Sequence, residues 1–182
     1  SLELGGDGVV AHPCLLPAER YPAAGQPLAG ALLAVLRNHT PAAIAVDELF
    51  DRSAALAAAE VGKRGVQLLA TAHAQSLADL IDDAALAPVL GDFETVTLSD
   101  REAARRAKTQ ADRRKVRRQR VRNATFDCVV ELKPKHANKP GEWAVVLDVN
   151  AAIDAVVENA PYDAQARFYD DDHTLHAAHM RI

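Results

Sequence analysis

Hydrophobic positions in the first half of the chain follow helical spacing in some stretches and form short continuous runs in others. Leucines and a valine recur at helical spacing over 28–38, and an alanine-rich stretch over 52–64 predicts a second helix that Gly65 ends. Short apolar runs at 42–46 and 66–72 are typical of buried strands. A strand, helix, strand, helix order favours a parallel sheet with helices on both faces.

Two capping patterns predict further helices. Ser76 and Asp79 are spaced as in a capping box, and a helix is expected to follow Ser76. Residues 94–98 predict a third strand. Ser99 and Glu102 repeat the capping pattern at the start of another helix.

The last third of the chain predicts a small antiparallel unit. Residues 125–132 and 143–147 read as two strands joined by a turning loop. Asn150 is expected to cap a short helix, and residues 166–180 predict a final hairpin that turns at 170–172. We therefore divide the chain into an α/β core over 1–108, a basic linker or arm over 109–124, and C-terminal strands with a short helix over 125–182.

Composition is compatible with one packed domain and a small appendage. The hydrophobic content of 49% is enough to fill a core. The longest apolar run, residues 29–36, is far below the roughly 20 residues that span a bilayer, so no membrane span is expected. Cys14 and Cys128 lack metal-ligand or CxxC spacing and indicate ordinary thiols of a reducing compartment.

Charge is distributed unevenly along the chain, although the net charge is only -4. Residues 101–122 contain eleven Lys or Arg but only two acidic residues, Glu102 and Asp112. Such a segment is either a solvated arm or a contact for the phosphate backbone of a nucleic acid. For the second interpretation the candidate contacts are Arg113, Arg114, Arg117 and Arg118. No aromatic residue is interleaved with them, so base stacking within the segment is not expected.

An acidic pair, Asp47 and Glu48, follows the first apolar run directly. In parallel sheets the ligand crevice lies at the carboxyl ends of the strands, where this pair is expected. Phosphoryl transfer requires a carboxylate that holds Mg²⁺ through water and another that orients the attacking water. The alternative is that the pair only caps the next helix.

The second apolar run ends in Thr71, Ala72 and His73 at the same expected edge. A hydroxyl group and an imidazole there could contact the terminal phosphate of a nucleotide. His73 could instead be a solvated loop residue. Since two adjacent strand ends would build one site, the two motifs together favour nucleotide hydrolysis more than either does alone.

A phosphate-binding loop of the form GxxxxGK[ST] does not occur in these residues. Glycines 5, 6 and 8 lead into a proline-rich stretch and lack the Lys-Ser/Thr pair. The opening from Ser1 reads as the end of a strand entering a loop, and we expect the chain to be part of a longer protein.

A histidine cluster near the end of the chain suggests a metal site. His173, His176 and His179 recur beside 170–172. Residues three apart in a strand point to opposite faces, which disfavours a shared ion.

Several motifs, taken in their order along the chain, resemble those of one known family. They are Glu3-Leu4-Gly5-Gly6-Asp7-Gly8 with His12-Pro13, Arg37-Asn38-His39-Thr40-Pro41 leading to Val46-Asp47-Glu48, Arg64-Gly65-Val66-Gln67-Leu68 leading to Thr71-Ala72-His73, and Val96-Thr97-Leu98-Ser99-Asp100. The chain resembles the seedling plastid development protein-like family of plastid and cyanobacterial AAA-like P-loop ATPases, related to stage III sporulation protein AA.

This resemblance implies a partial P-loop NTPase fold similar to secretion and RecA-like motors, with its phosphate-binding loop outside these residues. It implies Asp47 as the residue that holds Mg²⁺, Glu48 as the catalytic acid, His73 as the phosphate sensor and Glu3 as a second acidic residue near ATP. ATP and Mg²⁺ are the implied cofactors, and a homo-oligomeric ring is the implied assembly. Chloroplast and bacterial cytoplasm are the implied compartments.

We therefore expect part of an ATP-hydrolysing motor that is inactive without its phosphate-binding loop. The alternative is a non-catalytic nucleic-acid-binding module that uses the basic segment 101–122.

Overall fold

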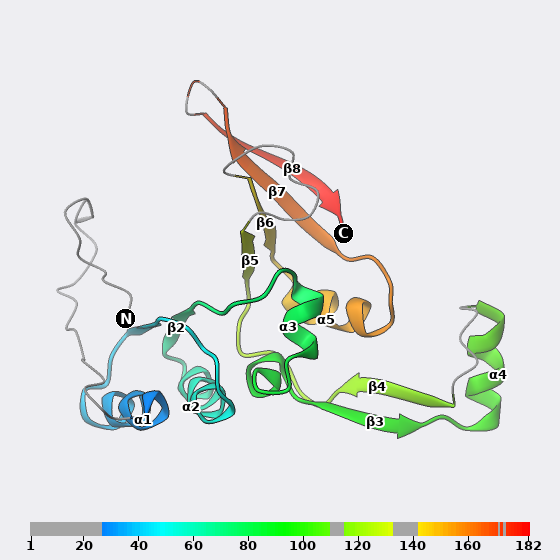
Figure 1. The fold of residues 1–182 in the computed structure, drawn as a ribbon, viewed down its shortest axis with the longest axis horizontal. Coiled ribbons are helices and arrows are strands. Elements are labelled where there is room, and N and C mark those ends of the chain that lie inside the picture. The colour runs from blue at the N-terminus through cyan, green and yellow to red at the C-terminus, as the bar shows by residue number, and fades with distance from the viewer. Residues whose placement is uncertain (1–26, 110–114, 133–141, 171, 173) are drawn as a thin grey trace.

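The computed structural model describes residues 27–109, 115–132, 142–170, 172 and 174–182, with only the backbone described for 105–109. The predicted roles of Glu3, Arg113, Arg114 and His173 therefore concern positions outside the described residues. Three regions are visible in Figure 1: two helices with a short parallel sheet, an antiparallel sheet that carries the C-terminus, and a hairpin that leads to a helix.

The first region has the order of elements that the hydrophobic pattern predicted. Helix α1 (Leu28–Asn38) precedes strand β1 (Ala43–Val46), and helix α2 (Arg52–Lys63) precedes strand β2 (Gln67–Ala70). The two strands pair in parallel with Ala43 opposite Gln67, which confirms the predicted crossover. No further strand joins this pair among the described residues, and the P-loop NTPase fold stays a prediction.

Helix α2 begins at a side-chain cap. The Asp51 carboxylate accepts hydrogen bonds from the backbone N–H groups of Ser53 and Ala54, at 2.8 and 2.9 Å. The hydrogen bond from the Ser53 side chain, with these backbone bonds, lowers the pKa of Asp51. This cap fixes where the chain turns from the end of β1 into α2.

The core is built around the small side chains of α2. Ala54, Ala55, Ala58 and Val61 are fully buried. Small side chains allow close packing of neighbouring elements, here the 3₁₀ helix η1 (Ala87–Leu90), whose residues are all buried. Helix α3 (Leu77–Asp82) adds Leu77 and Ile81 to the same core, and Ser76 caps it as predicted.

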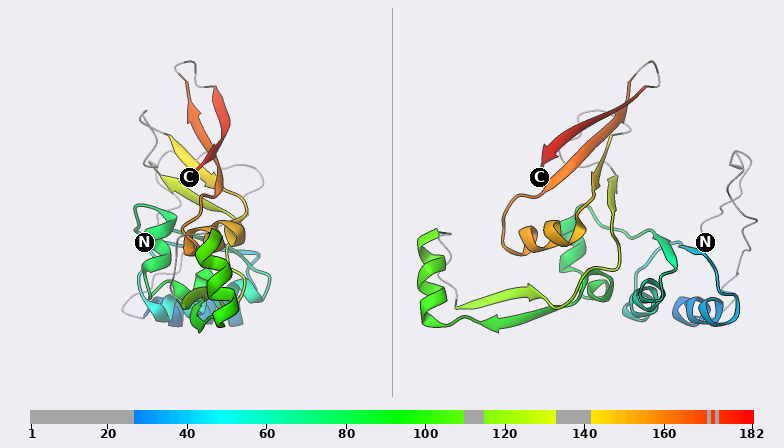
Figure 2. Two further views of the ribbon diagram at one scale, coloured as in Figure 1. Left: turned by 90° about the vertical axis from the view of Figure 1, so that its right-hand side faces the viewer. Right: turned by 180° about the vertical axis from the view of Figure 1, so that it is seen from behind.

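The third predicted strand pairs differently from the sequence-based expectation. Strand β3 (Phe93–Thr97) pairs antiparallel with β4 (Val116–Arg120) and not with the parallel strands. Helix α4 (Asp100–Thr109) lies between them in sequence, and Ser99 and Glu102 make the predicted reciprocal cap. Figure 2 shows this hairpin extending away from the rest of the molecule with α4 at its far end.

Strand β4 lies within the segment that the sequence predicted to be a basic linker or arm. At the base of the hairpin, at the end away from α4, the Gly91 carbonyl accepts a hydrogen bond from the Arg122 N–H at 3.0 Å. Gly91 has a φ of 98°, and a Cβ there would lie 2.0 Å from the Arg122 carbonyl oxygen, so only glycine fits. Residues 116–120 are thus a strand of an antiparallel hairpin in the structure, within the segment predicted to be a linker.

The C-terminal region is an antiparallel sheet, as predicted. Its strands are β5 (Val129–Leu132), β6 (Trp143–Val146), β7 (Asp163–Tyr169) and β8 (Leu175–Arg181), in that spatial order. Helix α5 (Val149–Val157) follows β6 and is capped by Asp148, not by Asn150 as predicted. Asn150 is the second residue of the helix, and its side-chain oxygen accepts a hydrogen bond from Arg120.

Glu131 joins this sheet to the helical core. Its carboxylate accepts hydrogen bonds from the Leu77 N–H at 2.8 Å and from the Tyr162 hydroxyl at 3.0 Å. Burial of Tyr162 and the adjacent Glu131 carboxylate raise the pKa of Tyr162 above 10.0. The neutral hydroxyl therefore remains a donor across the ordinary pH range.

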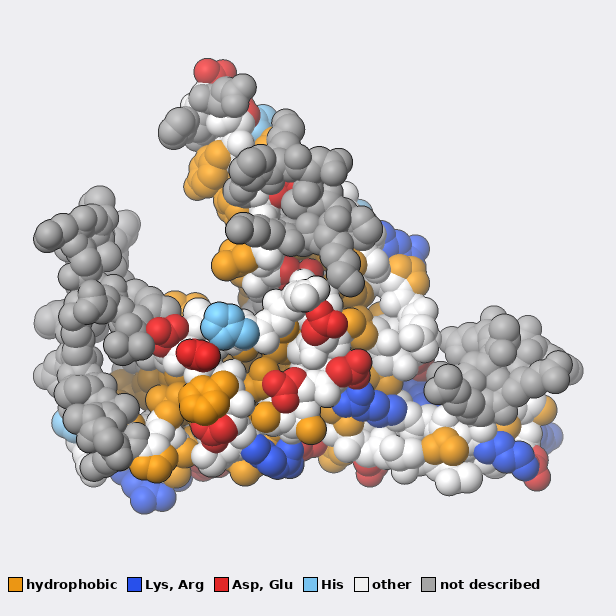
Figure 3. Space-filling view, viewed as in Figure 1, with side chains coloured by type: hydrophobic (Ala, Val, Ile, Leu, Met, Phe, Trp, Pro, Cys, Tyr) orange, Lys and Arg blue, Asp and Glu red, His pale blue; other side chains and the backbone are white. Residues whose placement is uncertain are grey.

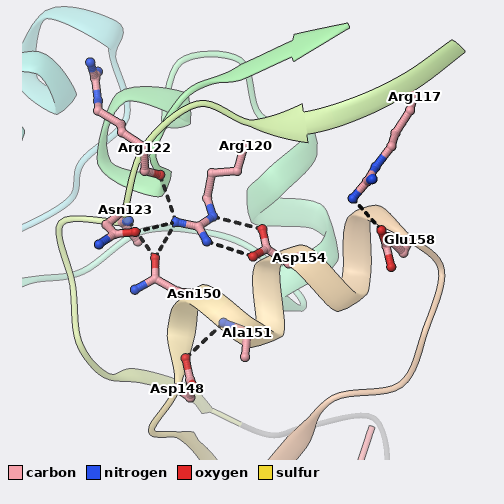
Figure 4. A network of polar contacts seen from close by, with 10 residues as sticks. Arg117, Arg120, Arg122, Asn123, Asp148, Asn150, Ala151, Asp154 and Glu158 are labelled. Atoms are coloured by element: carbon pink, nitrogen blue, oxygen red, sulfur yellow. Dashed lines mark hydrogen bonds and ion pairs between the residues drawn. The ribbon is translucent and has the colours of Figure 1, made fainter. Parts of the chain in front are cut away.

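Arg120 connects β4 to α5 through the densest polar network in the described part of the chain (Figure 4). Its guanidinium forms a bidentate pair with Asp154, at 3.0 and 2.8 Å. Its Nη1 donates to the carbonyl of Arg122 at 2.8 Å and to the side-chain oxygens of Asn123 and Asn150, at 3.2 and 2.6 Å. The Arg120 side chain is only 11% exposed.

Within the described residues, no helix is both long enough and apolar enough to cross a membrane.

Replacing Arg120 with alanine tests this network. We expect Arg120→Ala to lower the free energy of unfolding by about 2–3 kcal/mol, because the largely buried guanidinium that pairs with Asp154 is lost. Asn150 loses one of its two hydrogen bonds and keeps the one from the Ala124 N–H. Arg64→Ala is the matched control, because the Arg64 side chain forms an exposed ion pair with Glu60, and its loss should cost less than about 1 kcal/mol. Urea unfolding measures both, and equal losses would contradict the assignment.

Candidate functional site at the ends of strands β1 and β2

The carboxyl ends of β1 and β2 bring four predicted site residues together. Asp47 and Glu48 follow β1, while Thr71 and His73 follow β2. Because the strands are parallel and in register up to Val46 and Ala70, both ends lie at one edge of the sheet. Figure 3 shows acidic and histidine side chains side by side on the surface near β2.

Thr71 links the two strand ends through both its side chain and its backbone. Its Oγ1 accepts a hydrogen bond from the Glu48 N–H at 2.8 Å and donates to Asp47 Oδ1 at 3.0 Å. Its carbonyl accepts from the Leu49 N–H at 2.8 Å, and its N–H donates to the Val46 carbonyl at 3.2 Å. The parallel pairing is thereby extended beyond the strands themselves.

The position of Thr71 refines its predicted role. From its place at the end of the second apolar run, this hydroxyl is expected to contact the terminal phosphate of a nucleotide. In the structure this hydroxyl orients Asp47 and holds the backbone of Glu48. Sequence reasoning did not identify Leu49, whose N–H completes the same junction. No side-chain pattern signals that contribution, because it comes from the backbone.

Glu48 has a strained backbone. Its φ is 59°, in the left-handed region that a non-glycine residue adopts at a cost. The hydrogen bonds of Thr71 and Leu49 hold the chain in this turn. The carboxylate of Glu48 is thereby directed toward His73, whose Nε2 lies 3.7 Å from Glu48 Oε1.

Both partners of this contact are open to solvent. The Glu48 side chain is 53% exposed and the His73 side chain is 88% exposed. An exposed carboxylate and imidazole held at one sheet edge are suited to positioning water or an oxygen-rich ligand. In the described residues no group of three metal-ligating side chains is close enough to hold an ion by itself.

The predicted nucleic-acid contacts Arg117 and Arg118 are engaged within the protein. Arg117 Nη2 donates to Glu158 at 2.6 Å. Arg118 donates to Asp82 at 3.0 Å and to the Ile81 carbonyl at 2.8 Å, and its guanidinium lies 4.2 Å from the centre of the Phe93 ring. Both arginines therefore contribute to attaching β4 to the body.

The histidines near the C-terminus lie on β8 and pair with carboxylates. His176 contacts Asp170 at 2.6 Å, and His179 contacts Asp163 at 3.3 Å. His176 and His179 are three positions apart in one strand and so project from opposite faces of the sheet, as the strand geometry predicted.

Comparison with known proteins identifies relatives of the chain. It is 33% identical over 175 residues to Protein SEEDLING PLASTID DEVELOPMENT 1 of Arabidopsis thaliana, a match that covers 94% of this chain and 24% of that protein. It is 34% identical over 173 residues to Uncharacterized protein ycf45 of Porphyra purpurea, covering 94% of this chain and 29% of that protein. A ycf45 protein of Cyanidium caldarium is 30% identical over 139 residues, which cover 75% of this chain and 38% of that protein.

These similarities support a relation of the chain to a plastid and cyanobacterial family. They also support a chloroplast location, which is one of the two compartments that the resemblance implied. The chain spans well under half the length of each relative. No family model matches the chain. No solved structure matches it either.

Replacing Glu48 with glycine tests whether the turn stores strain. Because glycine adopts a φ of 59° freely, we expect Glu48→Gly to raise the free energy of unfolding by about 1 kcal/mol. Asn159→Gly is the control, since Asn159 has a similar φ of 53° but asparagine tolerates this region better. Thermal or urea unfolding gives both values. A Glu48→Gly protein that is less stable than the wild type would contradict the presence of strain.

Proposed function

We propose that this chain contains the Walker B and sensor strands of a P-loop ATPase. One observation carries the proposal: two carboxylates, a hydroxyl and an imidazole from adjacent parallel strands lie at one edge of the sheet. Thr71 hydrogen-bonds the Asp47 carboxylate and the Glu48 backbone there, and the His73 imidazole lies 3.7 Å from the Glu48 carboxylate. Ligands of open parallel sheets bind at this edge. The order of the motifs in the sequence supports the same assignment.

Each residue has a distinct role in this proposal. Asp47, oriented by Thr71, would hold Mg²⁺ through water, and hard carboxylate oxygens suit that ion. Glu48 would orient the water that attacks the terminal phosphate. His73 would contact that phosphate as a sensor, and this contact would change when the phosphate is hydrolysed. Bound Mg²⁺ would neutralise charge on the phosphates, which is the main requirement of phosphoryl transfer.

The strained backbone of Glu48 supports a functional role for this residue. Strain of this kind persists where surrounding contacts hold it and is concentrated at active sites. A residue that only capped the following helix would not need it. That helix already has its cap in Asp51.

The phosphate-binding loop would be supplied by a part of a longer protein outside this sequence. None of the 182 residues forms a GxxxxGK[ST] motif. ATP binding, ATP hydrolysis and assembly into a homo-oligomeric ring are accordingly proposed for that longer protein.

The nucleic-acid-binding alternative is less well supported. Phosphate contacts require cationic side chains that are available to the solvent. Arg117 and Arg118 are paired with Glu158 and Asp82, so two of the four candidate arginines already have acidic partners. Arg113 and Arg114 lie outside the described residues, and this alternative stays a prediction.

ATP turnover by a longer protein that includes this chain tests the proposal. We expect Glu48→Gln to lower kcat at least about 100-fold while Mg²⁺-dependent ATP binding is retained, because the amide cannot accept a proton from or polarise water. Glu60→Gln removes the same charge from the surface of α2 and should leave kcat unchanged. Circular dichroism verifies that both variants fold. Unchanged turnover in Glu48→Gln, or the absence of ATP binding in the wild type, would overturn the proposal.

A further inference from the structure

Strand β8 forms an open edge of the C-terminal sheet. It pairs with β7 over seven residues without interruption, from Arg181 opposite Asp163 to Leu175 opposite Tyr169. None of the described strands lies on its other side. Figure 1 shows β8 at the margin of the sheet. An open edge is a template for pairing with another strand.

The hydrogen-bond pattern identifies the backbone groups at this edge. Tyr162 and Ile182 exchange two hydrogen bonds of 2.9 Å, and the Asp170 N–H donates to the Thr174 carbonyl at 3.1 Å. In an antiparallel ladder every second residue bonds the neighbouring strand, so the even-numbered residues of β8 face β7. The odd-numbered residues direct their N–H and C=O groups to the open edge: Leu175, Ala177, His179 and Arg181.

The residues of β8 themselves lack the features by which edge strands prevent pairing. Strand β8 contains no proline, no lysine and no bulge, and its only fully charged residue is the terminal Arg181. Ala177 and Ala178 occupy its centre, where small side chains leave room for a second strand. Leu175, at one end, is 48% exposed.

We propose that two copies of this chain associate by antiparallel pairing of their β8 strands about a two-fold axis at Ala178. In this register Leu175 lies opposite Arg181 of the second copy, and Ala177 lies opposite His179 of the second copy. Every odd-numbered residue then bonds a partner, because antiparallel pairing matches outward-facing residues with one another. The two four-stranded sheets become one continuous sheet.

Charge complementarity favours a second copy as the occupant of this edge. The turn before β8 contains Asp170 and the exposed Asp172. Antiparallel pairing brings Arg181 of the second copy to the beginning of β8, beside this acidic turn. The contact occurs twice in a two-fold dimer. No like charges face each other in this register, since alanines occupy the centre.

Disulfide cross-linking tests the register directly. With Cys14 and Cys128 replaced by serine, we expect Ala178→Cys to give a covalent dimer on mild oxidation. Ala178 would face itself in a non-hydrogen-bonded pair, with Cα atoms about 4.5 Å apart, a separation that suits a disulfide. Ala177→Cys is the matched control, because the two Ala177 positions would be diagonal and about 7–8 Å apart, so it should cross-link poorly.

Charge exchange provides a second test that uses analytical ultracentrifugation of the 182-residue chain. We expect Arg181→Glu to weaken dimerisation about fivefold, and Asp172→Arg to restore it when both changes are combined.

Three outcomes would overturn the proposal: a chain that is monomeric at all concentrations, equal cross-linking by the two cysteine variants, or failure of the double variant to recover dimerisation. It does not depend on the proposed ATPase activity, since dimerisation is measured without nucleotide.

Discussion

The hydrogen bonds of Thr71 are the interactions on which the candidate site depends. Two parallel strands reach one edge, where their ladder pairing ends at Val46 and Ala70. Thr71 connects the two strand ends through its hydroxyl, its carbonyl and its N–H, and so fixes Asp47 and the turn at Glu48. The turn at Glu48 is held by these bonds, and His73 lies 3.7 Å from the Glu48 carboxylate beyond it.

A second set of interactions holds the outer elements to this core. Three arginines of β4 contact carboxylates on two helices: Arg117 with Glu158 and Arg120 with Asp154 on or beside α5, and Arg118 with Asp82 on α3. Arg120 is the most buried of the three and makes the most contacts. Three residues of a segment that is strongly basic in sequence therefore hold strand β4 against α3 and α5. Its local charge is balanced by acidic residues far away in the chain.

The sequence predicted the elements whose signals are local. The spacing of Leu28, Leu32 and Leu36 indicated α1, and Ser76 and Ser99 marked the starts of two helices. It did not predict β4, because arginines replace the apolar alternation that marks a strand, and the carboxylate that pairs with Arg117 lies 41 residues away. For the site, parallel pairing was enough to bring Asp47 and Thr71 together. The strain at Glu48 and the contact of Leu49 depend on backbone geometry, which residue types do not encode.

Hydrogen exchange at the Glu48 amide tests the role of Thr71 most directly, by comparing the wild type with Thr71→Val and Thr71→Ser. We expect Thr71→Val to accelerate exchange of this amide by about tenfold, because its acceptor is lost, while Thr71→Ser retains the hydroxyl and most of the protection. Amides in β8 should exchange at the wild-type rate in both variants. Equal protection of Glu48 in all three proteins would contradict the account, because the site would then be organised without the Thr71 hydroxyl.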